Sequence, residues 1–291
     1  MKDPIKEQPM ELSRRSLLTG AAAAGFGLAA GSTLTGCPVD GPTDEQILNF
    51  ALNLEYLEAE YYTRAVGRTL VDVGLDSGVV VGGSEVPFES ESIRQYAEEI
   101  AADEEAHVKL LRDSLGALAV SRPEIDLAGA FTAAARAAGL AGPDESFDPF
   151  ANEVNFLLGA YLFEDVGVTA YKGAAPLLSN AINVRDAAGL LGTEAYHAGE
   201  VRSLLYSMGE ETRNAAEAIS DARDSLDGNT DLDQGLLDRN DRANIVPTDS
   251  EGLVFSRTVS QVLNVVYLTS ETGAFRGGFF PEGVNGSLNT T

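Results

Sequence analysis

The sequence predicts an all-α fold: a bundle of four long helices with one long crossover connection, followed by a C-terminal extension that holds a short fifth helix and loops. Three observations predict it. Four long segments between residues 43 and 209 have helical apolar periodicity and capping signals near their ends. No β-rich region competes with them. The connection over residues 117–147 is long enough to run the length of a bundle, as a single-crossover topology requires.

The first helix is predicted to begin at a capping box, Thr43-x-x-Gln46, and to continue to about Val66, where Gly67 can end it. Residues 67–90 are rich in Gly, Val and Ser. Such a composition predicts a long loop, here with a short hairpin around Val79–Val81.

The second helix is predicted to begin at another capping box, Ser92-x-x-Gln95, and to run to Leu115, with Gly116 as its stop. The connection that follows, over residues 117–147, contains an Ala-rich stretch near Glu124–Ala138. That stretch predicts a short helix within the crossover.

The third helix is predicted to follow Asp148 as cap and Pro149 at the first helical position, and to run to about Gly173. The fourth spans roughly residues 183–208, with Gly209 after it. These two helices complete the predicted bundle, over residues 43–209.

The C-terminal extension, residues 210–291, is acidic and is expected to pack on the bundle. Within it, residues 221–250 are Asp-rich and predict a loop, and Thr258–Tyr267 predicts the fifth helix. The segment Gly277–Gly283 has too many glycines for regular structure and predicts a packed loop.

Both histidines of the chain follow a glutamate by three residues: Glu104 precedes His107, and Glu194 precedes His197. Positions i and i+3 of an α-helix lie on one face, one turn apart. Each pair therefore directs a carboxylate and an imidazole at the same point, where they could share a cation.

The other two long helices each offer a carboxylate for the same site, Glu55 in the first and Glu164 in the third. Tyr62 follows Glu55 by seven residues, and Tyr171 follows Glu164 by seven, so each Tyr shares its Glu's face. The order Glu-x6-Tyr, Glu-x-x-His thus occurs twice, as an internal repeat of a helix pair. Glu58 is the alternative ligand of the first helix, and the repeated Tyr spacing favours Glu55.

One Glu from each of two helices and Glu-x-x-His from each of the other two is the pattern of the dinuclear carboxylate site of ferritin-like proteins. Residues 43–209 therefore resemble the ferritin-like superfamily. Leu48–Glu55, Asn244–Asp249 and Gly277–Phe280 resemble the branch that contains the desiccation-related proteins. The first part of this resemblance is specific, whereas the tail segments imply no chemistry.

The resemblance implies two metal ions, iron foremost and manganese as an alternative, since four carboxylates and two imidazoles suit either. Glu104 and Glu194 would bridge the metals, Glu55 and Glu164 would be terminal ligands, and each metal would have one histidine. Tyr62 and Tyr171 are expected to be hydrogen-bond donors, redox-active groups or ordinary core residues. Asp103 could hold the second nitrogen of a ligand histidine, although Thr193 stands at the matching position.

Such a site implies reaction with dioxygen or peroxide, as a ferroxidase or a peroxidase. The alternative is a stress- or desiccation-related protein whose metal only stabilises the bundle. A closed iron-storage cage is disfavoured by the 67–90 insertion and the long tail.

The first residues predict export. Ser13-Arg14-Arg15-Ser16-Leu17-Leu18 precedes an Ala/Gly-rich run that ends in Leu34-Thr35-Gly36-Cys37. Residues 1–36 resemble a twin-arginine lipoprotein signal peptide, with Cys37 as the lipidated residue and 37–42 as a linker. This predicts a protein of the periplasm or cell envelope that meets a membrane only through its lipid. A transmembrane anchor over about residues 19–34 would be short and weakly apolar.

The charge composition disfavours two classes of partner. The chain has 45 acidic and 20 basic residues, a net charge of −25. That excess disfavours nucleic acid and anionic membrane surfaces. Cys37 is the only cysteine, so no intramolecular disulfide is possible.

Overall fold

The computed structural model describes residues 41–75 and 78–291. The predicted signal peptide, Cys37 and most of the predicted linker lie outside the described residues. The elements, in chain order, are α1 (Asp44–Ala65), η1 (Leu70–Val73), β1 (Val80–Val81), α2 (Glu91–Leu115), η2 (Gly116–Leu118), β2 (Ile125–Asp126), α3 (Gly129–Ala137), α4 (Glu153–Ala174), η3 (Ala175–Leu177), α5 (Ala181–Ser207), α6 (Glu210–Asp224) and α7 (Val259–Val266).

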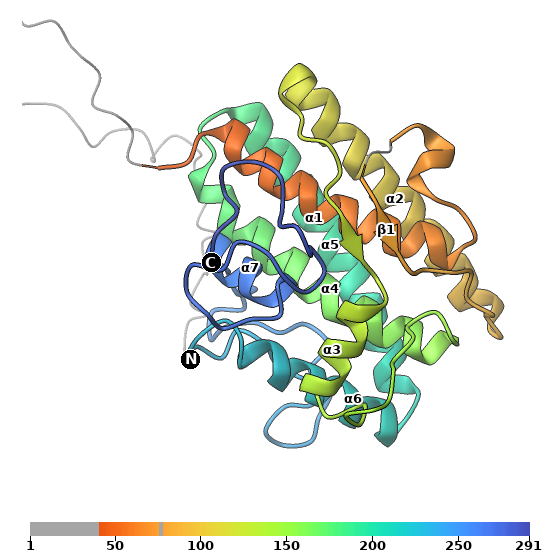
Figure 1. Cartoon of the computed structure of the whole chain (residues 1–291). Coiled ribbons are helices and arrows are strands. Elements are labelled where there is room, and N and C mark those ends of the chain that lie inside the picture. Colours follow the sequence, from red (N-terminus) through yellow and green to blue (C-terminus); the bar gives the residue numbers. More distant parts are fainter. Residues whose placement is uncertain (1–40, 76–77) are drawn as a thin grey trace, which may run out of the picture. The chain divides into compact units, whose positions relative to one another are not determined.

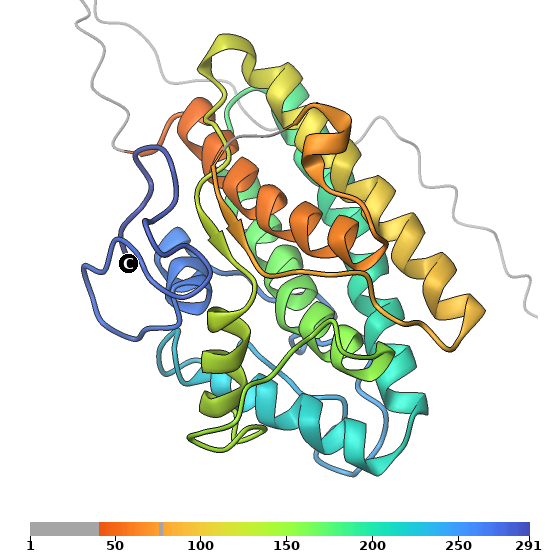
Figure 2. The ribbon, with the colours of Figure 1, turned by 45° about the vertical axis from the view of Figure 1, so that its right-hand side comes forward.

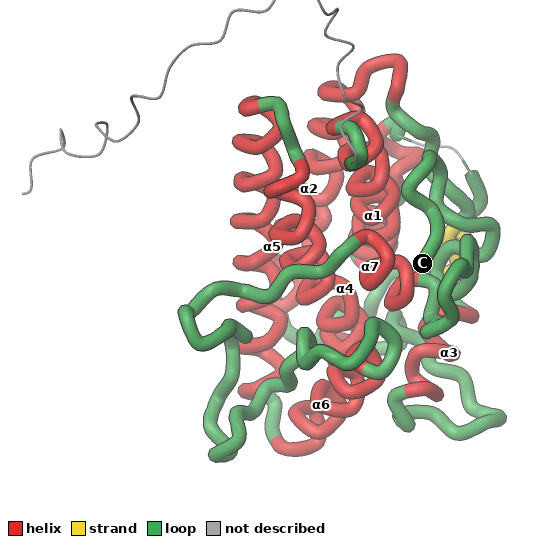
Figure 3. The backbone as a smooth tube through the Cα atoms, turned by 90° about the vertical axis from the view of Figure 1, so that its left-hand side faces the viewer, coloured by secondary structure: helices red, strands yellow, loops and turns green. Residues whose placement is uncertain are grey.

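Four long helices, α1, α2, α4 and α5, form a bundle, which confirms the predicted all-α fold (Figure 1). α1 packs mainly on α2, and α4 mainly on α5, while α1 and α4 also touch at the centre. Figure 3 shows the four helices side by side, with α6 across one end and α7 against the side of the bundle.

Three helices begin at other residues than the sequence predicted, because a different residue caps each of them. Ser90, not Ser92, caps α2. Its Oγ accepts a hydrogen bond from the Ile93 backbone N–H, and the Ser90 backbone N–H donates to the carboxylate of Glu153, the first residue of α4. Asn152 caps α4, four residues after the predicted Asp148. α5 likewise begins at residue 181, two residues earlier than expected, with residue 180 as its cap.

The start of α1 agrees with the prediction. Thr43 and Gln46 form the capping box, with each side chain bound to the other residue's backbone N–H. Asp44 in the first turn accepts hydrogen bonds from Ser179 and Asn180, which ties the beginning of α1 to the beginning of α5. These bonds lower the pKa of Asp44, because backbone N–H donors stabilise the carboxylate form.

The connection from α2 to α4 runs back along the bundle, as Figure 2 shows. The hairpin expected around Val79–Val81 is wrong, because β1 pairs in parallel with the distant β2, Val80 opposite Ile125. This pairing joins the loop after α1 to the crossover. The predicted helix near residues 124–138 is confirmed only from Gly129, where α3 begins, since the first residues of that stretch belong to β2.

The C-terminal extension contains α7 where Thr258–Tyr267 predicted a helix, and also α6, which the sequence did not predict. The buried face of α6 consists mainly of polar and small residues: Thr212, Ala216, Ile219, Ser220 and Arg223. Only one large apolar side chain marks that face, so apolar periodicity could not reveal the helix. The predicted packed loop is confirmed at Phe279 and Phe280, which are fully buried.

A buried network of three Asp and three Arg side chains ties the extension to α4 and α5. In its first half, Arg202 and Arg223 both donate to Asp165 of α4, at 2.7 and 3.0 Å. In its second half, Arg257 donates to Asp227 at 2.7 Å and also to Asp233. Arg223 links the halves, because its Nε lies 2.8 Å from Asp233 Oδ1. Since every charge has a partner, six ionised groups can stay buried.

Candidate metal centre

The bundle brings together all six side chains that the sequence proposed as ligands. One comes from α1, one from α4, and two each from α2 and α5, where the i, i+3 spacing aims both at the interior. All are at most 6 % exposed. They are Glu55, Glu104, His107, Glu164, Glu194 and His197.

The first half of the cluster surrounds His107. Its Nδ1 lies 3.1 Å from Glu55 Oε2, 3.5 Å from Glu104 Oε2 and 3.6 Å from Glu194 Oε1. One ligand atom from each of these four residues lies within 4.8 Å of all the others. Three carboxylate oxygens and an imidazole nitrogen at this spacing can hold one metal ion.

The second half surrounds His197 and shares a glutamate with the first. His197 Nδ1 lies 3.3 Å from Glu104 Oε1 and 3.6 Å from Glu164 Oε2. The two oxygens of Glu104 therefore face different histidines, whose ring centroids are 6.3 Å apart. The Glu104 carboxylate thus lies between the two imidazoles.

Tyr62 and Tyr171 each donate a hydrogen bond to the glutamate of the other helix pair of the sequence repeat. Tyr62 of α1 donates to Glu164 of α4, and Tyr171 of α4 donates to Glu55 of α1. Each tyrosine shares a face with its own glutamate, as predicted, but α1 and α4 touch at the centre, so each hydroxyl meets the glutamate across the interface. The internal repeat is thus an approximate twofold relation in space.

Asp103 contacts the outer nitrogen of one histidine. Its Oδ2 lies 3.2 Å from His197 Nε2, and its side chain is 45 % exposed. An acceptor at Nε2 favours the tautomer in which Nδ1 is free to face the cluster. Thr193, at the matching position of the repeat, donates instead to the Gly189 carbonyl oxygen. His107 therefore has no such carboxylate among the described residues.

Several atoms of the cluster are buried without any hydrogen-bond partner among the described residues. They are both carboxylate oxygens of Glu104 and of Glu194, Glu164 Oε2 and His197 Nδ1. Buried polar atoms without partners are rare and unfavourable. Because these orphaned atoms lie in one cluster and are all metal-ligand types, the residues present fit metal binding.

Without metal, these groups perturb one another strongly. Burial raises the pKa of Glu55 to about 7 and that of Glu164 to about 8, and it raises the pKa of Glu194 well above its usual value. Burial also opposes ionisation of Glu104, but its contacts with both histidines lower its pKa to about 2. Burial opposes charging of the imidazoles as well, yet the glutamates raise the pKa of His107 to about 11 and of His197 to about 9.

These shifts predict that the metal-free protein loses stability as the pH rises from about 5 to 8. Glu55 and Glu164 keep their protons when folded but lose them near pH 4.5 when unfolded, so folding becomes less favourable through pH 7–8. The raised pKa values of the histidines act in the same direction above pH 6.5. The lowered pKa of Glu104 acts oppositely, but only below about pH 4.5.

Calorimetric melting of metal-free and metal-loaded protein at pH 5, 6.5 and 8 checks this. Bound metal ions replace the protons of the cluster, so the difference in Tm between the two forms should widen as the pH rises. A difference that stays constant over this range would contradict the assignment of the cluster as the metal site.

Two further residues lie at the cluster, one given by the sequence only as an alternative and one not considered. Glu58, considered only as an alternative to Glu55, is buried as well (6 % exposed). Burial and the carboxylates of Glu104, Glu164 and Glu55 raise its pKa well above its usual value. Gly167 of α4 lies beside it and was not considered. Its position three residues after Glu164 was the available signal, because that spacing places it on the glutamate's face.

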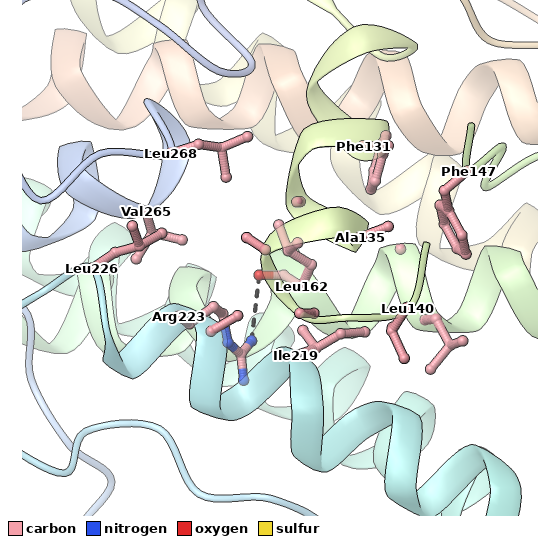
Figure 4. Close-up of a pocket in the computed structure, with 16 residues that line it drawn as sticks. Phe131, Ala135, Leu140, Phe147, Leu162, Ile219, Arg223, Leu226, Val265 and Leu268 are labelled. Atoms are coloured by element: carbon pink, nitrogen blue, oxygen red, sulfur yellow. Dashed lines mark hydrogen bonds between the residues drawn. The ribbon is translucent and has the colours of Figure 1, made fainter. Parts of the chain in front are cut away.

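An apolar pocket outside the cluster has no comparable chemistry. It lies between α3, α4, α6 and α7, lined by side chains such as Phe131, Leu162 and Val265 (Figure 4). Its one charged residue, Arg223, donates to backbone carbonyl oxygens of α4. None of the helices in residues 41–75 and 78–291 is long and apolar enough to span a membrane.

Comparisons with known proteins agree with this geometry. The model of the family described as "Ferritin-like domain" matches residues 43–207. The desiccation-related protein PCC13-62 of Craterostigma plantagineum is 30% identical over 242 residues, covering 76% of each chain. The ferritin-like catalase Nec2 of Nesocodon mauritianus is 26% identical over 271 residues, covering 84% of each chain. No solved structure matches the chain significantly.

Proposed function

The chain belongs to the ferritin-like domain family, and from this premise we propose that it is a dinuclear metal protein that decomposes peroxide. One observation carries the proposal: the two oxygens of Glu104 face two different histidines, and each histidine has a further glutamate of its own. A single buried carboxylate with imidazoles on both sides supports a site for two cations.

The chain's residues divide between the two metals. His107 and Glu55 would hold one ion, His197 and Glu164 the other, and Glu104 and Glu194 would bridge them. Iron or manganese suits this donor set, and zinc is a competitor. When bound, iron or manganese supplies a pair of redox-active centres that exchange electrons with dioxygen or peroxide.

The surrounding residues position the glutamates and keep bulk water out. Tyr62 and Tyr171 each donate to one oxygen of a terminal glutamate, which leaves the other oxygen for metal. The leucine, valine and phenylalanine side chains around the cluster belong to the continuous hydrophobic core. In such surroundings charge interactions are stronger than in water.

Peroxide is favoured over other oxidants by two considerations. The relative from Nesocodon mauritianus is named a ferritin-like catalase. Disproportionation of two hydrogen peroxide molecules oxidises one to dioxygen and reduces the other to water, so it needs no external electron donor. This chain has one cysteine and hence no cysteine-based electron-transfer site of the rubredoxin type.

Metal analysis combined with peroxide turnover tests the proposal. The protein should contain about two metal ions per chain and release dioxygen from hydrogen peroxide. In His107→Ala and His197→Ala, metal content should fall to about one ion or fewer and dioxygen release should be lost. A wild-type protein that binds no metal, or that binds zinc alone without turnover, would refute it.

A role without turnover is the second candidate, and the relative from Craterostigma plantagineum favours it, because that protein is named as desiccation-related. In this case the metal pair would only stabilise the bundle. This candidate would be favoured by three results together. The protein would contain two iron or manganese ions per chain, and its Tm would rise on metal loading. It would not react with peroxide, or with dioxygen and added iron(II).

We also propose that the protein is exported and held at the cell envelope by a lipid on Cys37. The twin-arginine pattern and the Leu-Thr-Gly-Cys box support this, since such signals are read by export and lipidation machinery. Mass spectrometry of the mature N-terminus should find an acylated Cys37. An N-terminus that retains residues 1–36 would contradict it.

A further inference from the structure

Besides Asp103 and Thr193, the internal repeat differs at a second pair of matching positions near the cluster. Three residues after Glu55, α1 has Glu58; three residues after Glu164, α4 has Gly167. Both positions are on the faces that carry the terminal glutamates. A repeat that keeps its glutamates, histidines and tyrosines thus departs from symmetry at the metal cluster itself.

Gly167 leaves space that two carboxylates occupy. A Cβ atom at this position would lie 2.3 Å from Glu194 Oε2 and 3.5 Å from Glu58 Oε1. The first distance is shorter than any ordinary contact, so even alanine would displace Glu194. The missing side chain on α4 is therefore what lets the carboxylates of α1 and α5 approach the same place.

Glu58 has no hydrogen bond or ion pair with any residue of the described chain, although it is buried. The next buried glutamate of α1, Glu60, binds Arg64 and Arg122. A buried carboxylate without a donor, among other carboxylates, is unfavourable unless a cation is present. Glu58 thus lacks a donor, as Glu104 and Glu194 do, although its oxygens are less completely buried than theirs.

A small cavity of about 10 Å³ adjoins Glu58 and Gly167. This volume is close to the smallest that admits one water-sized molecule. Val265 and Val266 of α7 are among its lining residues, and Glu58 is the only charged one. The remaining lining residues are Leu54, Leu57, Leu162, Phe163 and Val166.

We propose that Glu58 is a fifth carboxylate of the metal centre, on the side that Gly167 leaves open, and that it makes the two metal positions unequal. This rests on the proposed dinuclear centre. Four carboxylates balance the charge of two divalent ions, so a fifth favours the more highly charged, oxidised pair. Glu58 would act from the side of the small cavity, which is close to the size of a single water molecule.

Metal binding and thermal stability of Glu58→Gln, in the full chain, test the inference. Titration with manganese(II) should show at least about tenfold weaker binding at one of the two positions. At pH 8 the metal-free variant should melt higher than wild type, because a buried unpaired carboxylate has been removed, and the rise in Tm on manganese loading should be smaller. Glu99→Gln, on the exposed face of α2, should behave as wild type.

Gly167→Ala provides a second, independent variant. By displacing Glu194 it should weaken manganese binding without removing any carboxylate. If Glu58→Gln binds two manganese ions as tightly as wild type, Glu58 is not a ligand and the inference fails while the dinuclear centre stands. If wild type binds no manganese and no iron, the proposed function fails as well.

Discussion

Glu104→Ala is expected to bind neither metal ion tightly and to lose peroxide turnover to the background rate. Each oxygen of Glu104 faces a different histidine, at 3.5 and 3.3 Å, so one substitution removes a ligand from both positions. We expect the affinity of the pair to fall by more than about 100-fold, beyond the effect of losing a single outer contact. In contrast, His107→Ala removes a ligand from one position only.

Metal content after gel filtration, measured by mass spectrometry for Glu104→Ala, His107→Ala and wild type, distinguishes these effects. The matched control is Glu105→Ala, the neighbouring residue, whose carboxylate pairs with Arg68 at the surface. This control should keep both ions and its turnover, because Glu105 pairs with Arg68 and contacts neither histidine of the cluster. Two tightly held ions in Glu104→Ala would show that Glu104 is not the bridge.

The sequence was sufficient for the four long helices and for each Glu–His pair, because both depend on spacing along single helices. The convergence of the four helices on one cluster was implied by the resemblance to ferritin-like proteins. Glu104 and His107 must share a face wherever α2 lies. The hydrogen bonds of Tyr62 and Tyr171 depend on something else, namely on how α1 packs against α4. Spacing within one helix cannot show that each tyrosine reaches across to the other glutamate.

The errors arose where local signals compete or where burial is polar. Asp148 and Pro149 form an acceptable helix start, yet Asn152 begins α4, because residues 148–151 form a turn that buries Phe150. α6 was missed because its buried face includes Arg223, whose partners, Asp165 and Asp233, lie far away in the sequence. Such a face follows from the tertiary structure and leaves no periodic apolar pattern.

Glu58 illustrates a different limit. The sequence offered Glu55 and Glu58 as alternatives, on the assumption that the first helix supplies one ligand. In the structure both are buried at the cluster, and Gly167 makes room for the second. A glycine that acts by leaving space has no chemistry of its own, so motif reasoning passes over it.

Arg257→Met is expected to produce the largest loss of stability outside the metal centre. Arg257 is fully buried and donates to Asp227 at 2.7 Å, to Asp233, and to Thr169 of α4 at 2.7 Å. Methionine keeps much of the volume but leaves Asp227 as an unpaired buried carboxylate. Removing one partner of a buried pair destabilises by about 3–5 kcal/mol, which for a chain of this size lowers Tm by about 6–20 °C.

Melting curves of Arg257→Met with saturating metal check this, and two comparisons identify the cause. Arg242→Met removes an ion pair of similar length, 2.6 Å, but Arg242 is 73 % exposed, so its Tm should not change measurably. The double variant Arg257→Met/Asp227→Leu replaces the buried pair by apolar groups and should recover much of the loss. A double variant that melts lower than the single one would show that Arg257 acts through packing or through Thr169, because the unpaired charge would then not be the cause.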